Sequence, residues 1–346
     1  RTVARKSKNK KKINFFLSKT ILLKIIILPF ICIISFILYH SIPLFKQNYN
    51  YLIIVVLGSF FQGISPTWYF HGLQQMKKIA IPKFLVRLIS FLLIFNFVKT
   101  PNHGWIVLLL FSAANVFLCV YFLIIMTKNT GFIRLVGLSD LKEIFNYSKN
   151  SFLITIVPVL YQNISLIILS VFTNPLQLGL FYGANKIYRA FNSLFSPISN
   201  SFFPRISSIS QKNNKKFKST LSKYLFGIFA LSLVFLVFIL VFSKYLILLL
   251  LGQSYLPANE TLILFSLVLP LTAISNALGR QGLMYLNKDY NYLISQVSSS
   301  IIAFLIFLFF VKKFNINAFP ISLIFFEIIS IISICFYFKN AIRNNR

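Results

Sequence analysis

Four basic residues lie within long apolar segments of the chain: Lys24, Lys186, Arg189 and Arg280. A charge at the centre of a bilayer costs roughly 2.5–3.5 kcal/mol on insertion scales, so such residues usually face the interior of a helix bundle or a wet cavity. A membrane interior with several cations and almost no carboxylate suits an anion, whereas a cationic solute would need the opposite sign. These residues therefore predict a site that binds a negatively charged solute within a membrane.

The spacing of two groups of polar residues predicts a shared chamber. Asn185 and Lys186 precede Arg189 by four and three positions, so a helix would place the three side chains on one face. Asn276 and Arg280 repeat the spacing of four in a later segment. We expect the two faces to line one polar chamber.

Snorkelling, in which a long basic side chain near the end of a span reaches the headgroups, is the competing explanation for these bases. We favour it for Lys24, weigh it equally with a cavity role for Arg280, and prefer the cavity for Lys186 and Arg189. Glu327 is the only acidic residue well inside a span. The sequence leaves open whether Glu327 is a counter-ion to one of the bases or a proton-coupling group.

The amides Gln162 and Asn163 lie in a further apolar segment and are weaker candidates for contacts with sugar hydroxyls. Amides within spans also hold helices together, at around 0.6 kcal/mol apiece, which is the alternative role for most of them. The cysteines and histidines are scattered without metal-ligand spacing, and we find no P-loop, nucleophile elbow or paired carboxylates. We expect no metal, no cofactor and no enzymatic activity.

The composition indicates which elements must position these residues. Of 346 residues, 57% are hydrophobic and 12% are charged, and the mean hydropathy is +0.79. Ordinary soluble domains are roughly 45–50% apolar and about 25% charged, so a globule of this size could not hide the excess apolar surface. The sequence predicts an all-α, polytopic transmembrane helix bundle, and the net charge of +30 reflects basic flanks of apolar spans rather than a nucleic-acid partner.

Uninterrupted apolar stretches give ten candidate spans, of which the third and the sixth are weak because they contain bases. They cover residues 20–42, 50–70, 79–98, 104–126, 150–172, 177–203, 220–242, 258–286, 290–311 and 316–338. The run 245–251 is too short to cross and is expected to be an interfacial or re-entrant piece. Most of the 35 Lys and Arg residues fall on one side if the N-terminus is cytoplasmic, so both termini are predicted to be cytoplasmic.

Two polar interruptions are longer than the rest. In 127–149, apolar residues recur at helical spacing, and Asp140 and Glu143 form a D-x-x-E pattern suited to a helix start. We expect a short amphipathic helix on the cytoplasmic surface here, joining four spans to six. The second interruption, 204–219, is lysine-rich and is expected to be a solvated loop near anionic membrane lipids.

Three stretches carry a resemblance to a known family. They are GLFYGANKIYRAFNSLFSPISNSFFPRIS at 179–207, PTWYFHGLQQMKK at 66–78 and NALGRQGLMYLNK at 276–288. The chain resembles the polysaccharide biosynthesis proteins, in particular the Wzx-type O-antigen flippases of the multidrug/oligosaccharidyl-lipid/polysaccharide (MOP) exporter superfamily. Members usually have twelve spans in two lobes around a central cavity. The resemblance implies an N-lobe at 1–130, a linker at 131–149 and a C-lobe at 150–346, with about two spans missing before residue 1.

The resemblance implies translocation of an undecaprenyl-pyrophosphate-linked oligosaccharide, an O-antigen unit, across the bacterial inner membrane by alternating access. Lys186 and Arg189 would bind the phosphates, with Arg280 next. Asn185, Asn163 and Gln162 would be weaker sugar contacts. Relatives are thought to couple transport to an ion gradient, here of H⁺ or Na⁺, and the sequence does not name the ion.

Three other functions make different demands on the sequence. A cation-coupled drug exporter of the same superfamily predicts carboxylates in the N-terminal spans, yet the first acidic residue is Asp140. A membrane O-antigen polymerase would be expected to carry a large external loop, whereas the expected outside loops are short. A scaffolding membrane protein would leave the interior charges unexplained.

Overall fold

The computed structural model describes residues 10–41, 49–73, 75–100, 103–132, 137–199, 202, 214–286 and 288–343. Within these ranges the regular structure is entirely helical, which confirms the predicted all-α bundle. The chain divides into two compact units, Arg1–Ser148 and Lys149–Arg346, called unit 1 and unit 2 below.

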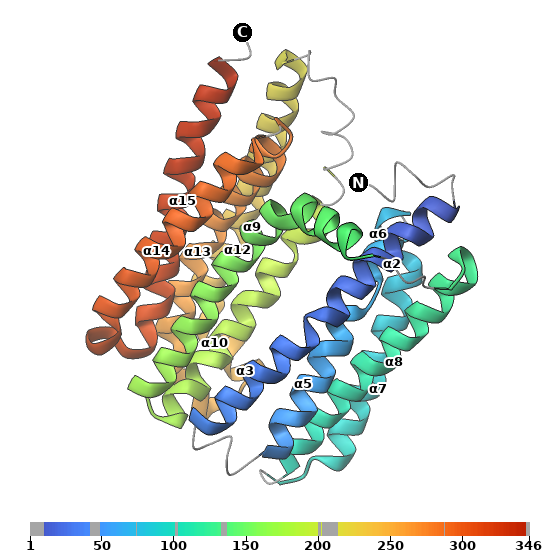
Figure 1. The fold of residues 1–346 in the computed structure, drawn as a ribbon. Coiled ribbons are helices and arrows are strands. Elements are labelled where there is room, and N and C mark those ends of the chain that lie inside the picture. Colours follow the sequence, from blue (N-terminus) through green and yellow to red (C-terminus); the bar gives the residue numbers. More distant parts are fainter. Residues whose placement is uncertain are drawn as a thin grey trace. The chain divides into compact units, whose positions relative to one another are not determined.

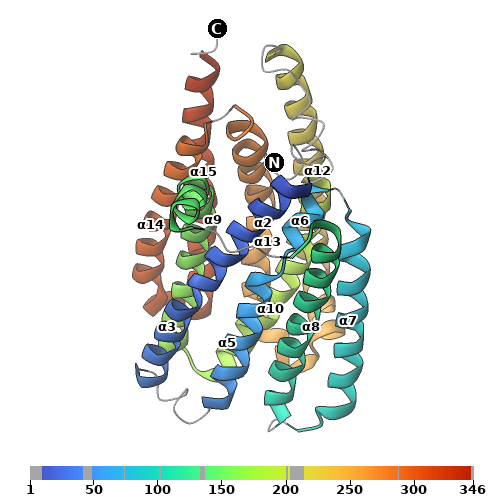
Figure 2. The same ribbon diagram turned by 45° about the vertical axis from the view of Figure 1, so that its right-hand side comes forward.

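Unit 1 is built around α8 (Gly104–Thr130), which packs along α5 (Tyr49–Ile64) and α7 (Lys77–Phe97), as Figures 1 and 2 show. The described part of the unit before residue 138 also contains α2 (Lys10–Ile26), α3 (Leu28–Ser41) and the short α6 (Thr67–Gly72). Two predicted spans are interrupted beside prolines. The first breaks at Ile27, two residues before Pro29, and the second at 65–66, where Pro66 follows α5, because proline lacks the N–H that continues a helix.

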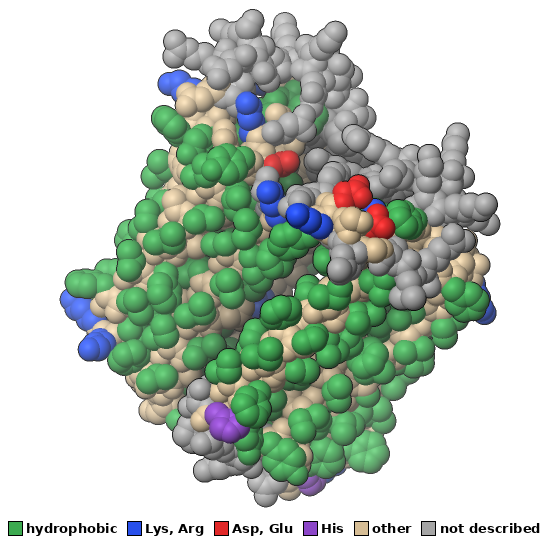
Figure 3. Space-filling view, viewed as in Figure 1, with side chains coloured by type: hydrophobic (Ala, Val, Ile, Leu, Met, Phe, Trp, Pro, Cys, Tyr) green, Lys and Arg blue, Asp and Glu red, His purple; other side chains and the backbone are tan. Residues whose placement is uncertain are grey.

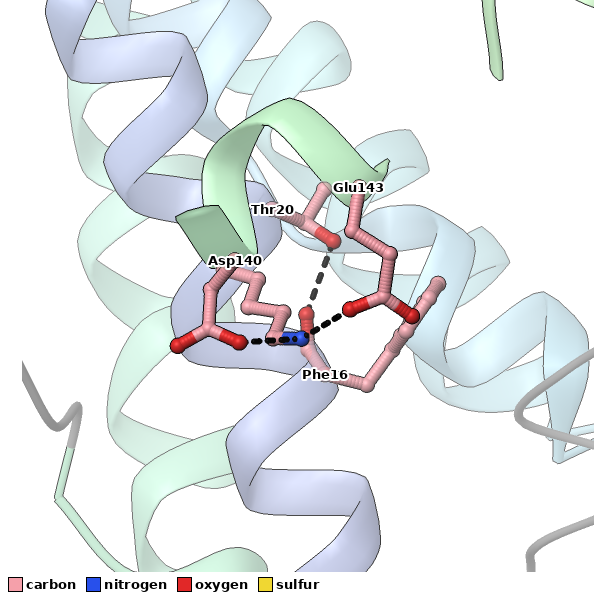
Figure 4. A network of polar contacts seen from close by, with 5 residues as sticks. Phe16, Thr20, Asp140 and Glu143 are labelled. Carbon is pink, nitrogen blue, oxygen red and sulfur yellow. Dashed lines mark hydrogen bonds and ion pairs between the residues drawn. The ribbon is translucent and has the colours of Figure 1, made fainter. Parts of the chain in front are cut away.

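Polar side chains of α2 attach it to the segment that follows α8. The Asn14 Nδ2 donates to the backbone carbonyls of Thr130, Gly131 and Phe132 at 2.9–3.0 Å. The Lys19 ammonium lies 2.8 Å from an Asp140 carboxylate oxygen and 2.7 Å from one of Glu143, and Figure 4 shows both carboxylates converging on α2. Because both acids come from the first turns of one helix, a single lysine ties α2 to that helix start.

That helix, α9 (Leu138–Phe172), has 35 residues. It begins inside the segment expected to be a separate amphipathic linker and continues without a break into the fifth predicted span. Asp140 lies in its first turn, where a carboxylate interacts favourably with the helix dipole. The surface helix and the span are therefore one element.

Unit 2 is centred on α13 (Asn259–Asn276), which packs against α10 (Pro175–Ser193), α12 (Asn214–Leu250) and α15 (Ala318–Arg343). Three short elements flank the long helices, namely the 3₁₀ helices η2 (Gln253–Ala258) and η4 (Asn315–Asn317) and the π-helix η3 (Ala277–Leu283). The helix α14 (Asp289–Phe314) completes the unit and packs along α15. Most of α13 is buried, including Phe265 and Leu269.

One sequence prediction is wrong in unit 2. Residues 245–251 were expected to be a separate interfacial piece, but α12 runs unbroken over 37 residues to Leu250. The polar pair Ser243 and Lys244 interrupts the apolar run without interrupting the backbone hydrogen bonds, since neither residue is a helix breaker. The helix ends only before Gly252, whose φ of +92° is readily adopted by glycine.

Within the described residues, eight segments are long and apolar enough to cross a membrane, judged by length and composition. The last of them, Asp289–Asn340, includes the two final predicted spans. The predicted span 177–203 is not among the eight, since α10 is a helix with many polar residues. Large hydrophobic side chains are exposed along the other helices, and they cover most of the face seen in Figure 3. The chain is therefore a multi-pass membrane protein.

Candidate functional site

The polar face of α10 lines a cavity of about 370 Å³ within unit 2, called the main cavity below. Asn174 caps this helix by accepting from the Gln177 backbone N–H at 2.8 Å, and Pro175 occupies its first turn. The cavity-lining residues of α10 recur at i, i+3, i+4 and i+7, the spacing of one helix face: Asn185, Tyr188, Arg189 and Asn192.

A second polar face, from α13 and η3, forms another part of the lining. Thr272, Ser275 and Asn276 share the helical spacing, and Arg280 follows in η3. The remaining polar lining comes from α9, α14 and α15 and includes Gln162, Tyr292, Gln296 and Glu327. Residues of both spaced motifs, namely Asn185, Arg189, Asn276 and Arg280, therefore line one cavity of unit 2.

The π-helical turn that carries Arg280 depends on a glycine. A Cβ on Gly279 would lie 2.3 Å from a ring atom of Tyr292, so η3 approaches α14 closely only because this residue has no side chain. The Met284 N–H donates to the Gly279 carbonyl five residues earlier, at 3.1 Å. Single π-helical turns of this kind are frequent at functional sites.

The two arginines of the main cavity are exposed to solvent within it. The Arg189 Nε donates to the Asn185 Oδ1 at 3.2 Å, which orients the guanidinium. Among the described residues, the ion pairs within 4.0 Å are those of Lys19, so neither arginine has a carboxylate partner at that distance. Two guanidinium groups with unused donors can together hold a phosphate or pyrophosphate.

The Glu327 side chain is buried in the wall of the same cavity. Its carboxylate accepts hydrogen bonds from the Thr272 hydroxyl, at 2.9 Å, and from the Ser275 hydroxyl. Over the described residues it has no basic partner within 4.0 Å. The counter-ion alternative therefore has no support in the geometry, and the carboxylate is left as a group that can take up a cation.

Two of the predicted site residues lie elsewhere. Lys186 is exposed and does not line the main cavity, because it lies about 100° around α10 from Asn185. Asn163 is also exposed, and its Nδ2 donates to the Val159 carbonyl at 2.8 Å. Lys24 belongs to unit 1, where its ammonium donates to the Gly63 carbonyl at 2.7 Å.

Some residues of the main cavity carry a weak signal or none in the sequence. Asn192 is one of the amides within the predicted spans, and it lies seven positions beyond Asn185 on the same helix face. Tyr292 and Gln296 carry a four-residue spacing but no charge that would single them out. No three His, Cys, Asp or Glu side chains gather into a metal-binding group in the described part of the chain.

Comparisons with known proteins agree on one family. Residues 1–210 match the sequence profile described as "Polysaccharide biosynthesis protein". A protein of Escherichia coli (strain K12) named "Putative O-antigen transporter" is 26% identical over 334 residues, covering 94% of this chain and 76% of the relative. A Shigella dysenteriae protein with the same name is 26% identical over 204 residues, covering 57% of this chain and 50% of its own.

Solved structures share the fold at low sequence identity. The "Lipid II flippase MurJ, inward closed conformation" superposes with a TM-score of 0.75 at 16% identity, covering 96% of this chain and 74% of that one. The "Crystal structure of MATE in complex with MaL6" gives a TM-score of 0.68 at 16% identity, with coverages of 99% and 82%. The polytopic helical fold of these transporters is therefore the fold of this chain.

Proposed function

The chain belongs to the polysaccharide biosynthesis protein family, and on this premise we propose that it is a flippase for an undecaprenyl-pyrophosphate-linked oligosaccharide. A sugar-bearing pyrophosphate cannot cross hydrocarbon unaided, because its polar groups would lose their hydrogen bonds to water. A wet chamber with fixed positive charge replaces those interactions. The curated relatives named as O-antigen transporters point to the same class of substrate.

The observation that carries this function is the pair of arginines in the main cavity. Arg189 and Arg280 come from different elements, line the same space and have no carboxylate partner within 4.0 Å among the described residues. We assign the pyrophosphate to these two guanidinium groups, with Asn185 and Gln162 as neutral contacts to the sugars. Lys186 and Asn163 lie outside this lining and receive no contact with the substrate here.

Transport is proposed to proceed by alternating access, in which the cavity opens to each side of the membrane in turn. Glu327 is the proposed coupling group, since a buried carboxylate without a basic partner gains most from binding H⁺ or Na⁺. Binding of the cation would remove a buried negative charge from the wall that faces the arginines. The affinity of the cavity for the pyrophosphate would then depend on the occupancy of Glu327.

The remaining assignments follow from this role. We propose the bacterial inner membrane as the location, cytoplasmic termini, and a transport rather than a catalytic activity. We further propose that residues 1–130 and 150–346 act as N-lobe and C-lobe, with 131–149 as the linker between them. Excess basic residues on one side of the predicted spans support this orientation.

The test is complementation of a flippase-null strain that makes the native glycan of this protein. The unaltered gene should restore surface polysaccharide, and Arg189→Ala and Arg280→Ala should each reduce it at matched membrane levels. Removing one charge-assisted hydrogen bond costs about 1.5–3 kcal/mol, or roughly a ten- to hundredfold loss of affinity. Undiminished polysaccharide in both variants would refute the site, and failure of the unaltered gene would refute the function.

A further inference from the structure

A second, smaller cavity of about 180 Å³ adjoins the main cavity in unit 2 and is called the side cavity. The two cavities share four lining residues: Asn192, Thr272, Asn276 and Arg280. A water molecule in the liquid occupies about 30 Å³, so the side cavity has room for a group much larger than one water. Its other polar lining is neutral and comes from Ser196, Ser199 and Gln281.

Gln281 indicates which kind of chemical group the side cavity can bind. Its side-chain Nε2 donates to the Ser199 backbone carbonyl at 3.1 Å, and only the NH₂ end of an amide can make that bond. The orientation of the amide is thereby fixed, and the carbonyl end is left over. The residue is 4% exposed, and its Oε1 is buried without a hydrogen-bond partner.

A buried acceptor without a partner is costly, so a group that fills the cavity must bring a donor. A sugar hydroxyl or the N–H of an acetamido group supplies one, whereas a phosphate oxygen is itself an acceptor and would be repelled. The phosphate-binding Arg280 lies on the wall common to both cavities. A pyrophosphate held in the main cavity would therefore bring its directly attached sugar next to Gln281.

We propose that the side cavity binds the sugar joined to the pyrophosphate, with the Gln281 carbonyl accepting a hydrogen bond from a hydroxyl or acetamido group. This inference rests on the proposed function and adds a position that senses whether the lipid carrier is loaded. Arg280 and Gln281 are neighbours in η3, so one π-helical turn holds the charge for the phosphate and the acceptor for the sugar. The bare carrier would bind to the arginines alone.

The test uses the full chain in nanodiscs and two probes, undecaprenyl pyrophosphate and undecaprenyl pyrophosphate bearing one N-acetylglucosamine. The unaltered protein should bind the glycosylated probe more tightly. Gln281→Met should weaken that binding about tenfold, the scale of one lost hydrogen bond to a buried partner, and leave the affinity for the bare probe unchanged. Unchanged binding of the bare probe also shows that the variant is folded.

A second variant reaches the same cavity from another helix. Ile228 of α12 lines the side cavity, and Ile228→Phe should narrow this cavity while leaving residue 281 a glutamine, giving the same selective loss. Gln62→Met removes an exposed amide in unit 1 and is the matched control, expected to change neither affinity.

The possible outcomes distinguish failure of the side-cavity inference from failure of the proposed function. Equal affinity of the unaltered protein for both probes would mean that the side cavity holds only water, and would overturn the inference. If Gln281→Met and Ile228→Phe weaken the binding of both probes equally, or of neither probe, the inference is also overturned. The proposed function would still stand if binding of the bare probe depends on the arginines. Failure of the unaltered protein to bind either probe would refute both.

Discussion

Charge is handled differently in the two units. In unit 1, the cation Lys19 has a side chain that is 9% exposed, and it is held by two carboxylates at 2.7–2.8 Å. In unit 2, Arg189, Arg280 and Glu327 line one cavity, yet among the described residues none of them has a partner of opposite charge within 4.0 Å. In unit 1, the Lys19 ion pairs fasten α2 to the start of α9, whereas the charged groups of the main cavity in unit 2 remain available.

We interpret this difference as one between charges that hold helices together and charges that are available to a ligand. A buried cation that is already paired gains little from a ligand, because the ligand would have to displace the existing carboxylates. The guanidinium groups of unit 2 keep unused donors, and a phosphate adds contacts without breaking an ion pair. The position of a base within an apolar span therefore says less about its role than the presence or absence of a nearby carboxylate.

Removing both cavity arginines should have the largest effect. Arg189→Ala combined with Arg280→Ala should lower the affinity for undecaprenyl pyrophosphate by at least about a hundredfold, since each charge-assisted contact contributes about 1.5–3 kcal/mol. Arg87→Ala in unit 1 is the comparison, because Arg87 also donates to an amide, the Asn115 Oδ1, at 3.2 Å. The affinities are measured by binding in nanodiscs. Equal losses of affinity in the double variant and in Arg87→Ala would contradict the distinction between the two units.

The sequence predicted the helical class and one face of the site, and its errors have physical causes. Asn185, Arg189, Asn276 and Arg280 were found because spacing along a helix converts directly into a shared face. The same spacing also predicts Lys186 for that face. Lys186 does not line the main cavity, because it lies one position after Asn185 and therefore about 100° away around the helix.

Other features of the site could not be read from the chain. The side-cavity role of Gln281 depends on one bond to the Ser199 carbonyl, 82 residues away in the sequence. The π-helical turn depends on contact between Gly279 and Tyr292. Neither contact leaves a pattern along the sequence, since both arise from the packing of helices against each other. The periodicity of the sequence indicates which residues share a helix face, whereas the partners of those residues are seen only in the tertiary structure.

Replacing the unpaired carboxylate of unit 2 should have the next largest effect. Glu327→Leu removes the acceptor of the buried Thr272 hydroxyl and leaves the Ser275 hydroxyl only the Thr272 carbonyl, at 3.3 Å. We expect it to lower the free energy of unfolding by about 1–3 kcal/mol relative to Glu327→Gln. The glutamine keeps hydrogen bonds to both hydroxyls but cannot take up a proton. Thermal unfolding in detergent measures the first effect.

A transport assay under imposed ion gradients measures the second. Glu327→Gln should still bind the carrier but should no longer respond to the gradient of H⁺ or Na⁺. A variant that keeps the full response of the unaltered protein would show that Glu327 is only a structural group. Unit 2 would then resemble unit 1, because its carboxylate would serve packing alone.

Two close helix contacts allow a matched test of packing in the two units. A Cβ on Gly58 would lie 2.4 Å from the Ser112 Oγ in unit 1, and one on Gly279 would lie 2.3 Å from the Tyr292 ring in unit 2. Alanine at either position should cost about 1–2 kcal/mol of stability through overpacking. Gly227→Ala, which meets no atom within 4 Å, should be neutral or stabilising.

The two glycine variants should differ in function. Gly279→Ala displaces a cavity-lining tyrosine and the π-helical turn, so it should also weaken binding of the glycosylated carrier. Gly58→Ala should lower stability while leaving that affinity unchanged. Equal binding losses would indicate that packing defects in either unit reach the cavity, and that the site is not confined to unit 2.

The paired lysine of unit 1 should give the smallest effect. In Lys19→Met the apolar side chain fills the space of the lysine stem, while Asp140 and Glu143, whose side chains are 30% and 75% exposed, turn to solvent. We therefore expect a loss of about 1 kcal/mol or less, close to that of a surface ion pair, measured by thermal unfolding. Lys142 is an exposed lysine on the same turn of α9, and Lys142→Met should change stability by less than about 0.5 kcal/mol.

A much larger loss of stability for Lys19→Met, insensitive to added salt, would show that the ion pair is desolvated, because salt screens exposed charges far more than buried ones. The Lys19 ion pairs of unit 1 would then be buried ion pairs. The charges of the two units would differ in burial as well as in pairing.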